Sequence, residues 1–342
     1  MAFALSVLDQ SPIPEGSTAG DALRNSIELA RLAESLGFHR YWVAEHHGTP
    51  GLACNSPEVL IGPIAAVTSS LRVGSGGIML PHYSPLKVAS SFSMHAGLYP
   101  DRIDLGVGRA AGTSGRVAEA LQRDRRQAAP DDFPEQLIEL LGYFEPRRDS
   151  AIRFHAPEVW MLGSSPQSAV WAAEHGLPYA FADFINSEGA ASAKYYRQQF
   201  RPSTRSSAPK VAVAAWVFCA DTDETAMRLS YPFRMMALQL YRGRPIPVPS
   251  VERAEEFLYK EGFPAETLPV GRRILTGSPN RVREAVEALA TEYAADEVLA
   301  VNIVHSHEQR MRSYGLLAHA FDMPTRVSRA RNGVDSGAIT HV

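Results

Sequence analysis

The chain has 342 residues, 45% of them hydrophobic and 21% charged, a balance typical of a globular protein with a substantial core. Its net charge of −3 and pI near 6.4, without a long basic run, argue against nucleic acid or an anionic membrane as the main partner. Because no apolar stretch reaches the roughly 18 residues of a membrane span and Asp9 interrupts the first apolar run, we expect neither a membrane span nor a signal peptide, but a cytoplasmic protein that binds a small molecule.

Short apolar, β-branched runs alternate along the chain with segments of helical period, which is the pattern of repeated βα units. Eight runs are predicted to be strands: Ala4–Leu8, Arg40–Ala44, Leu71–Gly74 continuing through Ile78–Leu80, Ile103–Val107, Val159–Gly163, Tyr179–Ala182, Val211–Cys219 and Glu297–Asn302. Eight such units close a barrel. The sequence therefore predicts an α/β fold of the (β/α)8 TIM-barrel class, formed by a single domain over residues 1–323.

The segments between the strands carry helix start signals and three long connections. Residues suited to cap a helix are Thr18 with Asp21, Thr222, Ser278 before Pro279, and Ser306 with Gln309. Residues 110–131, 183–209 and 243–271 are rich in Gly, Pro, Ser or Arg and are longer than a compact βα connection requires. We interpret them as insertions at the C-terminal face of the barrel. The polar tail, residues 324–342, lacks apolar periodicity and is expected to be flexible.

Two adjacent histidines, His46 and His47, follow the second predicted strand. Successive side chains of a strand point to opposite faces, so one imidazole is expected to face the site and the other to be structural. A histidine there can act as an acid, a base or a hydrogen-bond donor, because its unperturbed pKa is about 6.5. No HExxH on a predicted helix and no HxH on a predicted strand is present, so no metal site is expected. Cys54 and Cys219 form no Cys-x-x-Cys pair and are expected to be packing residues.

Three glycines, Gly74, Gly76 and Gly77, interrupt the third predicted strand. Glycines cost strand propensity, and they are tolerated where the backbone bulges or must lie close to another group. Both interpretations remain open from the sequence. If a bound group is the reason, a flat ring lying against the backbone would suit it.

A phosphate site is predicted where the fourth and fifth strands end. Arg109 ends the fourth strand and can bind a phosphate through paired, charge-assisted hydrogen bonds. Ser164, Ser165 and Ser168 surround the predicted start of the helix after the fifth strand, where hydroxyl and N–H groups suit either an anion or a helix cap. Neither a Gly-x-Gly-x-x-Gly fingerprint after the first strand nor a Walker loop is present. The phosphate is therefore expected to belong to a mononucleotide-like cofactor.

Four ordered segments resemble the bacterial-luciferase-like flavin monooxygenases: Val7–Pro12, Tyr41–His47, Val73–Pro85 and Arg102–Arg109. The resemblance continues through Asp131–Gln136, Leu162–Ser165 and Thr276–Pro279, so it covers about residues 4–321. It implies a TIM barrel that binds FMN, supplied as reduced FMN by a separate flavin reductase. It also implies that dioxygen is activated as a flavin hydroperoxide.

The same resemblance assigns roles to the residues singled out above. It implies that His46 is the catalytic histidine and that a non-proline cis peptide between Gly76 and Gly77 lies against the flavin ring. It also implies that Arg109, Ser165 and Ser168 hold the flavin phosphate, with Ser164 nearby.

The chain departs from bacterial luciferase at two positions, because Gly108 stands where luciferase has a cysteine and Ser164 where it has a glutamate. The resemblance therefore does not imply light emission. A second phosphate-binding arginine of the family has no counterpart that can be chosen among Arg123, Arg125 and Arg126.

The favoured function is an FMN-dependent monooxygenase that oxygenates a small organic substrate. The resemblance suggests an aromatic or polyketide-like substrate, as in the tailoring of secondary metabolites, and a homodimer. One alternative is a deazaflavin-dependent oxidoreductase that transfers hydride on the same barrel. A second alternative is a non-catalytic flavin-binding partner protein. Aromatic residues that can line a substrate pocket are Phe184, Tyr195, Tyr196, Phe200, Tyr231, Phe233 and Tyr241.

Overall fold

A closed barrel of parallel strands forms the centre of the molecule. The computed structural model describes residues 3–109, 115–121, 132–145, 154–262 and 272–324. The strands in this part of the chain are β1 (Ala4–Asp9), β2 (Arg40–Val43), β3 (Arg72–Met79), β4 (Ile103–Gly108), β5 (Glu158–Gly163), β6 (Tyr179–Ala182), β7 (Val211–Cys219), β8 (Ile274–Gly277) and β9 (Glu297–Val301). They pair in the order β6-β5-β4-β3-β2-β1-β9-β7-β8, and β6 also pairs with β7, which closes the barrel.

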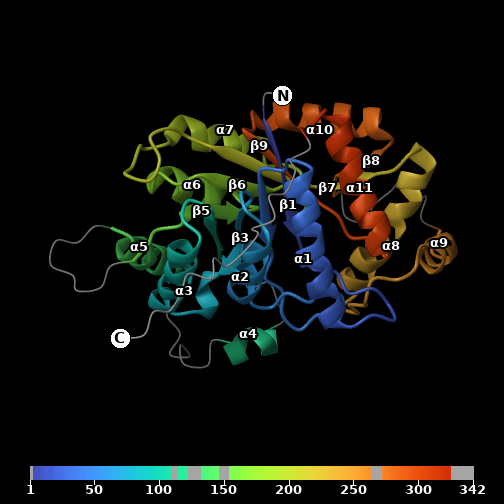
Figure 1. Cartoon of the computed structure of the whole chain (residues 1–342), viewed down its shortest axis with the longest axis horizontal. Coiled ribbons are helices and arrows are strands. Elements are labelled where there is room, and N and C mark those ends of the chain that lie inside the picture. The colour runs from blue at the N-terminus through green and yellow to red at the C-terminus, as the bar shows by residue number, and fades with distance from the viewer. Residues whose placement is uncertain (1–2, 110–114, 122–131, 146–153, 263–271, 325–342) are drawn as a thin grey trace, which may run out of the picture.

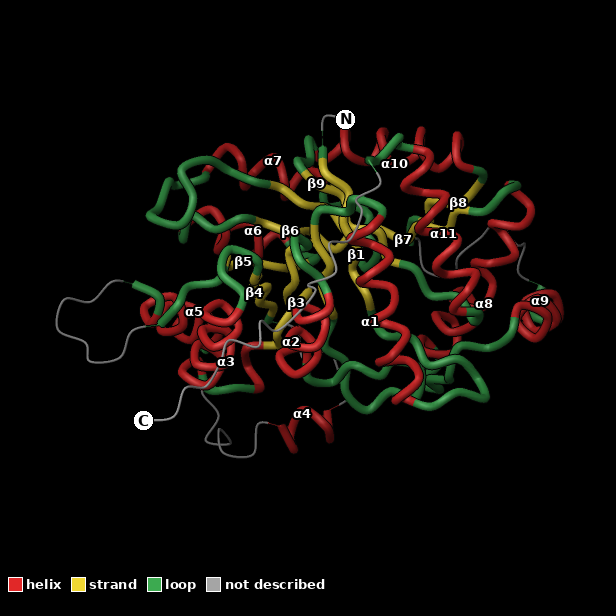
Figure 2. The backbone as a smooth tube through the Cα atoms, viewed as in Figure 1, coloured by secondary structure: helices red, strands yellow, loops and turns green. Residues whose placement is uncertain are grey.

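Helices surround the strands on the outside, as Figures 1 and 2 show. They are α1 (Ala19–Ser35), α2 (Pro57–Val67), α3 (Pro85–Leu98), α4 (Gly115–Leu121), α5 (Phe133–Tyr143), α6 (Pro166–Glu174), α7 (Ala190–Gln199), α8 (Asp223–Tyr241), α9 (Val251–Lys260), α10 (Pro279–Tyr293) and α11 (His307–Ala320), with a short 3-10 turn, η1 (Leu80–His82). No helix of the described residues is both long enough and apolar enough to cross a membrane.

The predicted α/β TIM-barrel class is confirmed, and the eight predicted strands are β1 to β7 and β9, with ends that differ by no more than one residue. The ninth strand, β8, was not predicted. It pairs only with Trp216–Cys219, the last part of β7, and therefore extends one side of the barrel wall beyond the closed ring. Only Ile274 and Leu275 of its four residues are apolar, so β8 lacks the apolar run by which the other strands were predicted.

The prediction of an insertion at residues 183–209 is wrong in part, because the segment holds α7, the connecting helix between β6 and β7. Tyr196 of this helix is buried, with its ring 5.3 Å from that of Tyr179.

The predicted insertion at residues 243–262 does cross the C-terminal face, since Val248 exchanges backbone hydrogen bonds of 2.8 and 2.9 Å with the loop after β1. The remainder of the predicted insertions (residues 110–114, 122–131 and 263–271) and tail residues 325–342 lie outside the described residues.

Charged residues and tryptophans fill the end of the barrel where the strands begin. Arg40 is 3% exposed, donates to Glu297 (2.6 Å) and Asp104 (2.7 Å), and lies 5.2 and 4.5 Å from the rings of Trp42 and Trp160. The indole N–H of Trp42 donates to the same Asp104 carboxylate at 2.9 Å. Buried charges in a low-dielectric interior require such partners. The cavity lined by the strands lies at the other end of the barrel.

The predicted helix starts at Thr18, Thr222 and Ser306 are confirmed, because each side chain accepts a hydrogen bond from a backbone N–H of the first turn. Ser278 precedes a helix as predicted, but its side chain forms no cap. Cys54 and Cys219 are free and buried, as expected of packing residues.

Candidate active site

A cavity of about 320 Å³ opens at the C-terminal ends of the strands, within the size range of small-molecule sites. Its walls include all seven residues that the sequence singled out: His46, Gly76, Gly77, Arg109, Ser164, Ser165 and Ser168. Apolar side chains contributed by five strands form much of the remaining wall: Leu8, Trp42, Met161, Leu162, Ala180 and Leu299. The cavity therefore combines an apolar interior with a few polar groups near its rim.

The two histidines after β2 have different surroundings. His46 lines the cavity, and its backbone N–H donates to the carbonyl of Cys54 at 2.9 Å. His47 does not line the cavity, and its Nε2 lies 2.6 Å from the carboxylate of Glu45. The expectation that only one imidazole faces the site is confirmed.

The Glu45 carboxylate holds this corner of the site together. Glu45 is 1% exposed, and besides His47 it accepts hydrogen bonds of 2.8 Å from the N–H of Met79 and the hydroxyl of Tyr83. Burial, followed by the negative charge of Glu45 and the hydrogen bond to it, raises the pKa of Tyr83. Sequence reasoning did not assign a role to Glu45, although a carboxylate between a strand end and two histidines was a signal for one. Glu45 thus ties β2 to the segment that follows β3.

The His46 imidazole is neutral at neutral pH. Burial, together with the nearby His47, lowers the pKa of His46 to about 4. Its Nδ1 atom is buried and has no hydrogen-bond partner in the described structure. A neutral imidazole has one N–H donor and one acceptor nitrogen, so this side chain can either give a hydrogen bond to a bound group or accept a proton from one.

The glycines of β3 explain how its backbone reaches the cavity wall. The register between β3 and β4 shifts between Ser75 and Ile78, so the bulge that the sequence left open is present. The bond between Gly76 and Gly77 is cis, as the resemblance implies. A Cβ at Gly76 would come within 2.5 Å of Leu8, and one at Gly77 within 2.8 Å of the carbonyl of Gly106. Only glycine therefore fits between the neighbouring strands at these positions.

Arg109 and the serine turn lie at the rim of the same cavity. Arg109 is exposed at the end of β4, with its guanidinium 5.3 Å from the ring of Trp171 in α6. Ser165 precedes α6, but its side chain does not cap the helix, so helix capping does not account for its hydroxyl. An arginine beside a helix N-terminus, with a serine hydroxyl that does not cap the helix, suits the binding of a phosphate or another anion.

Ser168 differs from the other two serines. It is 3% exposed, its hydroxyl donates to the carbonyl of Ser165 at 2.6 Å, and it lies 3.0 Å from the hydroxyl of Tyr179. Its side chain therefore already has partners within the protein. A Cβ at Gly163 would lie 2.2 Å from this hydroxyl, so a glycine is required beside it.

Of the aromatic residues proposed for a substrate pocket, Phe184 lines the cavity. Tyr196 and Phe233 belong to the packed core instead, and Tyr241 is exposed. Lining residues that were not predicted include Gln10 and Trp171. Among the residues that the structure describes, no group of three or more His, Cys, Asp or Glu side chains is arranged to hold a metal ion.

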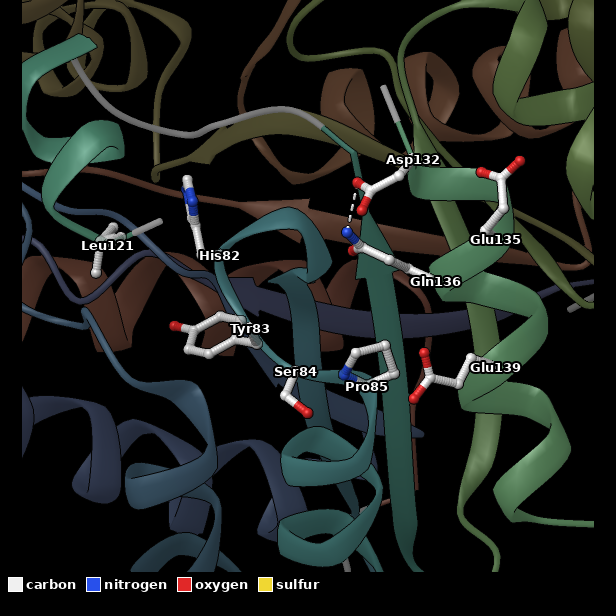
Figure 3. A pocket seen from close by; sticks show the side chains of 9 residues that line it. All are labelled: His82, Tyr83, Ser84, Pro85, Leu121, Asp132, Glu135, Gln136 and Glu139. Atoms are coloured by element: carbon white, nitrogen blue, oxygen red, sulfur yellow. Dashed lines mark hydrogen bonds between the residues drawn. The ribbon is translucent and has the colours of Figure 1, made fainter. Parts of the chain in front are cut away.

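A second hollow, of about 450 Å³, lies beside the start of α5 (Figure 3). Its walls carry the carboxylates of Asp132, Glu135 and Glu139, with His82 and Tyr83 across from them. Three carboxylates would repel a phosphate, and the hollow lacks the apolar walls that an aromatic ring system requires. The cavity at the barrel mouth is therefore the better candidate for a flavin-type ligand.

Comparison with known proteins identifies a family. The family model described as luciferase-like monooxygenase matches residues 1–297. Bacillus subtilis YwcH, a protein of uncharacterized function, is 43% identical over 330 residues, which cover 93% of this chain and 99% of the relative. N-acetyl-S-alkylcysteine monooxygenase, also of Bacillus subtilis, is 35% identical over 326 residues, which cover 92% of this chain and 97% of the relative.

Solved structures of the same fold include proteins with different cofactors. The crystal structure of apo-MsnO8 has a TM-score of 0.87 and 39% identity, and the match covers 95% of this chain and 100% of that one. The oxygenating constituent of 3,6-diketocamphane monooxygenase, in complex with FMN, has a TM-score of 0.68 and 22% identity, covering 93% and 97% of the two chains. An F420-dependent secondary alcohol dehydrogenase has a TM-score of 0.58 and 14% identity, covering 93% and 99%. The last two matches establish a shared fold.

Proposed function

Because the chain belongs to the luciferase-like monooxygenase family and is an oxidoreductase of that family, we propose that it is an FMN-dependent monooxygenase that oxygenates a small organic substrate. The observation that carries the proposal is the convergence of His46, the Gly76–Gly77 backbone and Arg109 on one largely apolar cavity. Each residue is weak support alone. Their occurrence in a single cavity of suitable size is much stronger support.

The cavity fits the parts of FMN. We assign the flavin phosphate to Arg109 and the N-terminus of α6, with the hydroxyls of Ser164 and Ser165 as further donors. Ser168 would support the turn through its bond to the Ser165 carbonyl. The ring system would lie along the Gly76–Gly77 backbone, where the absence of side chains permits close approach.

The chemistry of the bound cofactor would be the supply of two electrons to dioxygen, with one oxygen atom going to the substrate and the other leaving as water. In this scheme the apolar walls exclude bulk water from the reacting groups. His46, neutral because burial lowers its pKa to about 4, would give or accept a proton through its buried ring nitrogen. Glu45 would keep His47 away from the cavity and so leave His46 as the imidazole beside the reacting groups.

The substrate is proposed to be a small organic molecule, with an aromatic or polyketide-like compound of secondary metabolism as the first class to test. The name of the Bacillus subtilis relative that acts on N-acetyl-S-alkylcysteine adds thioethers to that search. Phe184, which lines the cavity and whose ring lies 5.5 Å from that of Trp216, offers an aromatic contact for either class.

The partners proposed are a separate flavin reductase, as the source of reduced FMN, and a second copy of this chain. Exposed apolar side chains on α2 and α3, namely Val59 (68% exposed), Met94 (69%) and Leu98 (68%), support a homodimer formed through these helices.

Anaerobic titration followed by rapid mixing tests the proposed function. The protein is titrated with reduced FMN and, separately, with a reduced deazaflavin, and each complex is mixed with oxygenated buffer in a stopped-flow spectrometer. Tight binding of reduced FMN, followed by a transient absorbance that differs from both reduced and oxidised FMN, is the expected result. Tight binding of the deazaflavin without an oxygen-dependent transient would instead assign hydride transfer. Flavin binding with no transient and no turnover would indicate a non-catalytic partner protein.

A further inference from the structure

A third cavity, of about 640 Å³, lies between α8, β8 and the start of α10, elements that Figure 1 shows close together. It shares no lining residue with the cavity at the barrel mouth. Three arginines line it: Arg234 from α8, Arg272 just before β8, and Arg281 from α10. The proposed function uses none of them.

Arg234 is a buried cation without a carboxylate partner in the described structure. It is 3% exposed, its Nε donates to the hydroxyl of Ser230 at 2.8 Å, and its Nη2 lies 3.4 Å from the sulfur of Met227. The remaining Nη1 is buried and has no hydrogen-bond partner. Burial lowers the pKa of this arginine. An arginine nevertheless stays protonated, so its unpaired charge is costly and a bound anion would offset that cost.

Two more buried donors line the same cavity from the β8 side. The Nε of Arg272 and the hydroxyl of Thr276 are both buried without a hydrogen-bond partner in the part of the chain that the structure describes. Buried polar groups are rarely left unsatisfied in native proteins, and three of them on one cavity indicate a ligand that satisfies them together. Guanidinium and hydroxyl donors suit an oxyanion.

The carboxylates at this cavity do not neutralise Arg234. Asp223 accepts hydrogen bonds from the Nη1 of Arg281 at 3.1 Å and from the backbone N–H of Ser278 at 2.7 Å. Glu224 is exposed to solvent. The cavity lining therefore carries three arginine charges against two carboxylate charges. Because Asp223 is paired with Arg281, the guanidinium groups of Arg234 and Arg272 are the ones proposed to contact a ligand.

We propose that Arg234, Arg272 and Thr276 form an oxyanion site, separate from the barrel-mouth cavity, that binds inorganic phosphate or sulfate, or the carboxylate of an organic acid. The site does not depend on the proposed monooxygenase function. Its walls differ from those of the barrel-mouth cavity, and its arginines come from α8 and from the segment that enters β8.

Calorimetric titration of the full chain with phosphate, sulfate and acetate tests the oxyanion site. The titrations use an Arg109→Gln background, which removes the arginine at the barrel mouth. Arg234→Met and Arg272→Met are each expected to weaken binding about tenfold or more, the effect of losing a hydrogen bond to a charged group. Arg312→Met, at an exposed arginine paired with Asp221, is the matched control and is expected to change nothing. No binding of any anion, or equal binding by the Arg234→Met/Arg272→Met double variant, would overturn the proposal.

The anion preference identifies the chemical class of the ligand. Tighter binding of phosphate or sulfate assigns an inorganic or ester anion, and tighter binding of acetate assigns a carboxylate.

Thermal unfolding separates a ligand-binding role for Arg234 from a packing role. In chloride buffer, Arg234→Met is expected to melt at or above the wild-type temperature, because it removes an unpaired buried charge. The preferred anion is then expected to raise the melting temperature of the wild type but not of the variant. A variant that melts lower and still responds fully to the anion would contradict the proposal. Arg272→Met provides the same comparison at a less buried arginine.

Discussion

The Oε1 atom of Glu45 lies 2.6 Å from Nε2 of His47, and this contact separates two adjacent histidines into different surroundings. The carboxylate also accepts hydrogen bonds from Met79 and Tyr83, so it joins β2 to the turn after β3. His46, one residue earlier, is left facing the cavity with a buried, unpartnered ring nitrogen.

Glu45→Gln is expected to lower the free energy of unfolding by about 2 kcal/mol, because charged hydrogen bonds are replaced and an NH2 group is placed against donors. Urea unfolding of the wild type and the variant measures the difference. Glu135→Gln, at an exposed carboxylate on α5, is the control and is expected to change stability by less than about 0.5 kcal/mol. Equal stability of the Glu45 variant would show that the three contacts contribute nothing net.

His46→Ala is expected to leave FMN affinity within a few-fold of the wild type but to reduce coupled oxygenation by about 10²-fold or more, the usual size of a general acid–base contribution. Binding is followed by flavin fluorescence, and coupling by the ratio of product formed to reduced FMN consumed. His47→Ala serves as the neighbouring comparison, since His47 lies outside the cavity. Full product turnover by the His46 variant would remove this residue from the mechanism.

The pH dependence of His46 follows from its surroundings, because burial and His47 lower its folded-state pKa to about 4, below the unperturbed value of about 6.5. The neutral form therefore contributes stability that is fully present above pH 6.5 and is lost as the pH falls toward 4. NMR of the imidazole protons should show no His46 titration between pH 5.5 and 8. Stability of His46→Asn should decline less than that of the wild type over the acid range; an equal decline would contradict the lowered pKa.

Arg109→Ala is expected to weaken FMN more than riboflavin, because only FMN carries the phosphate. Loss of a charged bidentate contact corresponds to about tenfold or more in FMN affinity. Fluorescence titration with both flavins measures the two losses, and Arg312→Ala controls for the change in net charge. An equal loss for FMN and riboflavin would mean that Arg109 acts on structure, through its contact with Trp171.

Arg40→Leu is expected to destabilise the fold by about 3–5 kcal/mol, because it leaves the buried Glu297 carboxylate without its arginine and removes one of the two arginines that pair with Asp104. Chemical denaturation measures the loss. Arg24→Leu, at a 72% exposed arginine on α1, is the control and is expected to have little effect. Similar losses in the two variants would mean that the buried cluster has no special role in stability.

The sequence was sufficient for the barrel because its strands contain apolar runs bounded by turns, whereas only two of the four residues of β8 are apolar and that strand depends on its pairing with β7. The helix α7 was missed because its segment carries Gly, Pro and Ser at both ends, and its helical character depends on packing through Tyr196.

The candidate site was predictable at positions where the chemistry of the residue type and its place at a strand end indicate the function together. Arg109 at a strand end and a histidine after a strand point to anion binding and proton transfer by their chemistry alone. The role of Glu45 depends on three donors from distant parts of the chain, and the hydrogen bonds of Ser168 depend on Tyr179, so neither was visible from local sequence.

The ion cluster of Arg40, Asp104 and Glu297, with the tryptophans above it, has a kinetic consequence for the barrel. It occupies the end where the strands begin, whereas the cavity lies at their C-terminal ends. If ligands enter and leave through the mouth of the barrel, a ligand bound deeper exchanges only after one bound nearer the mouth has departed. Competition kinetics with two ligands would then show an ordered release.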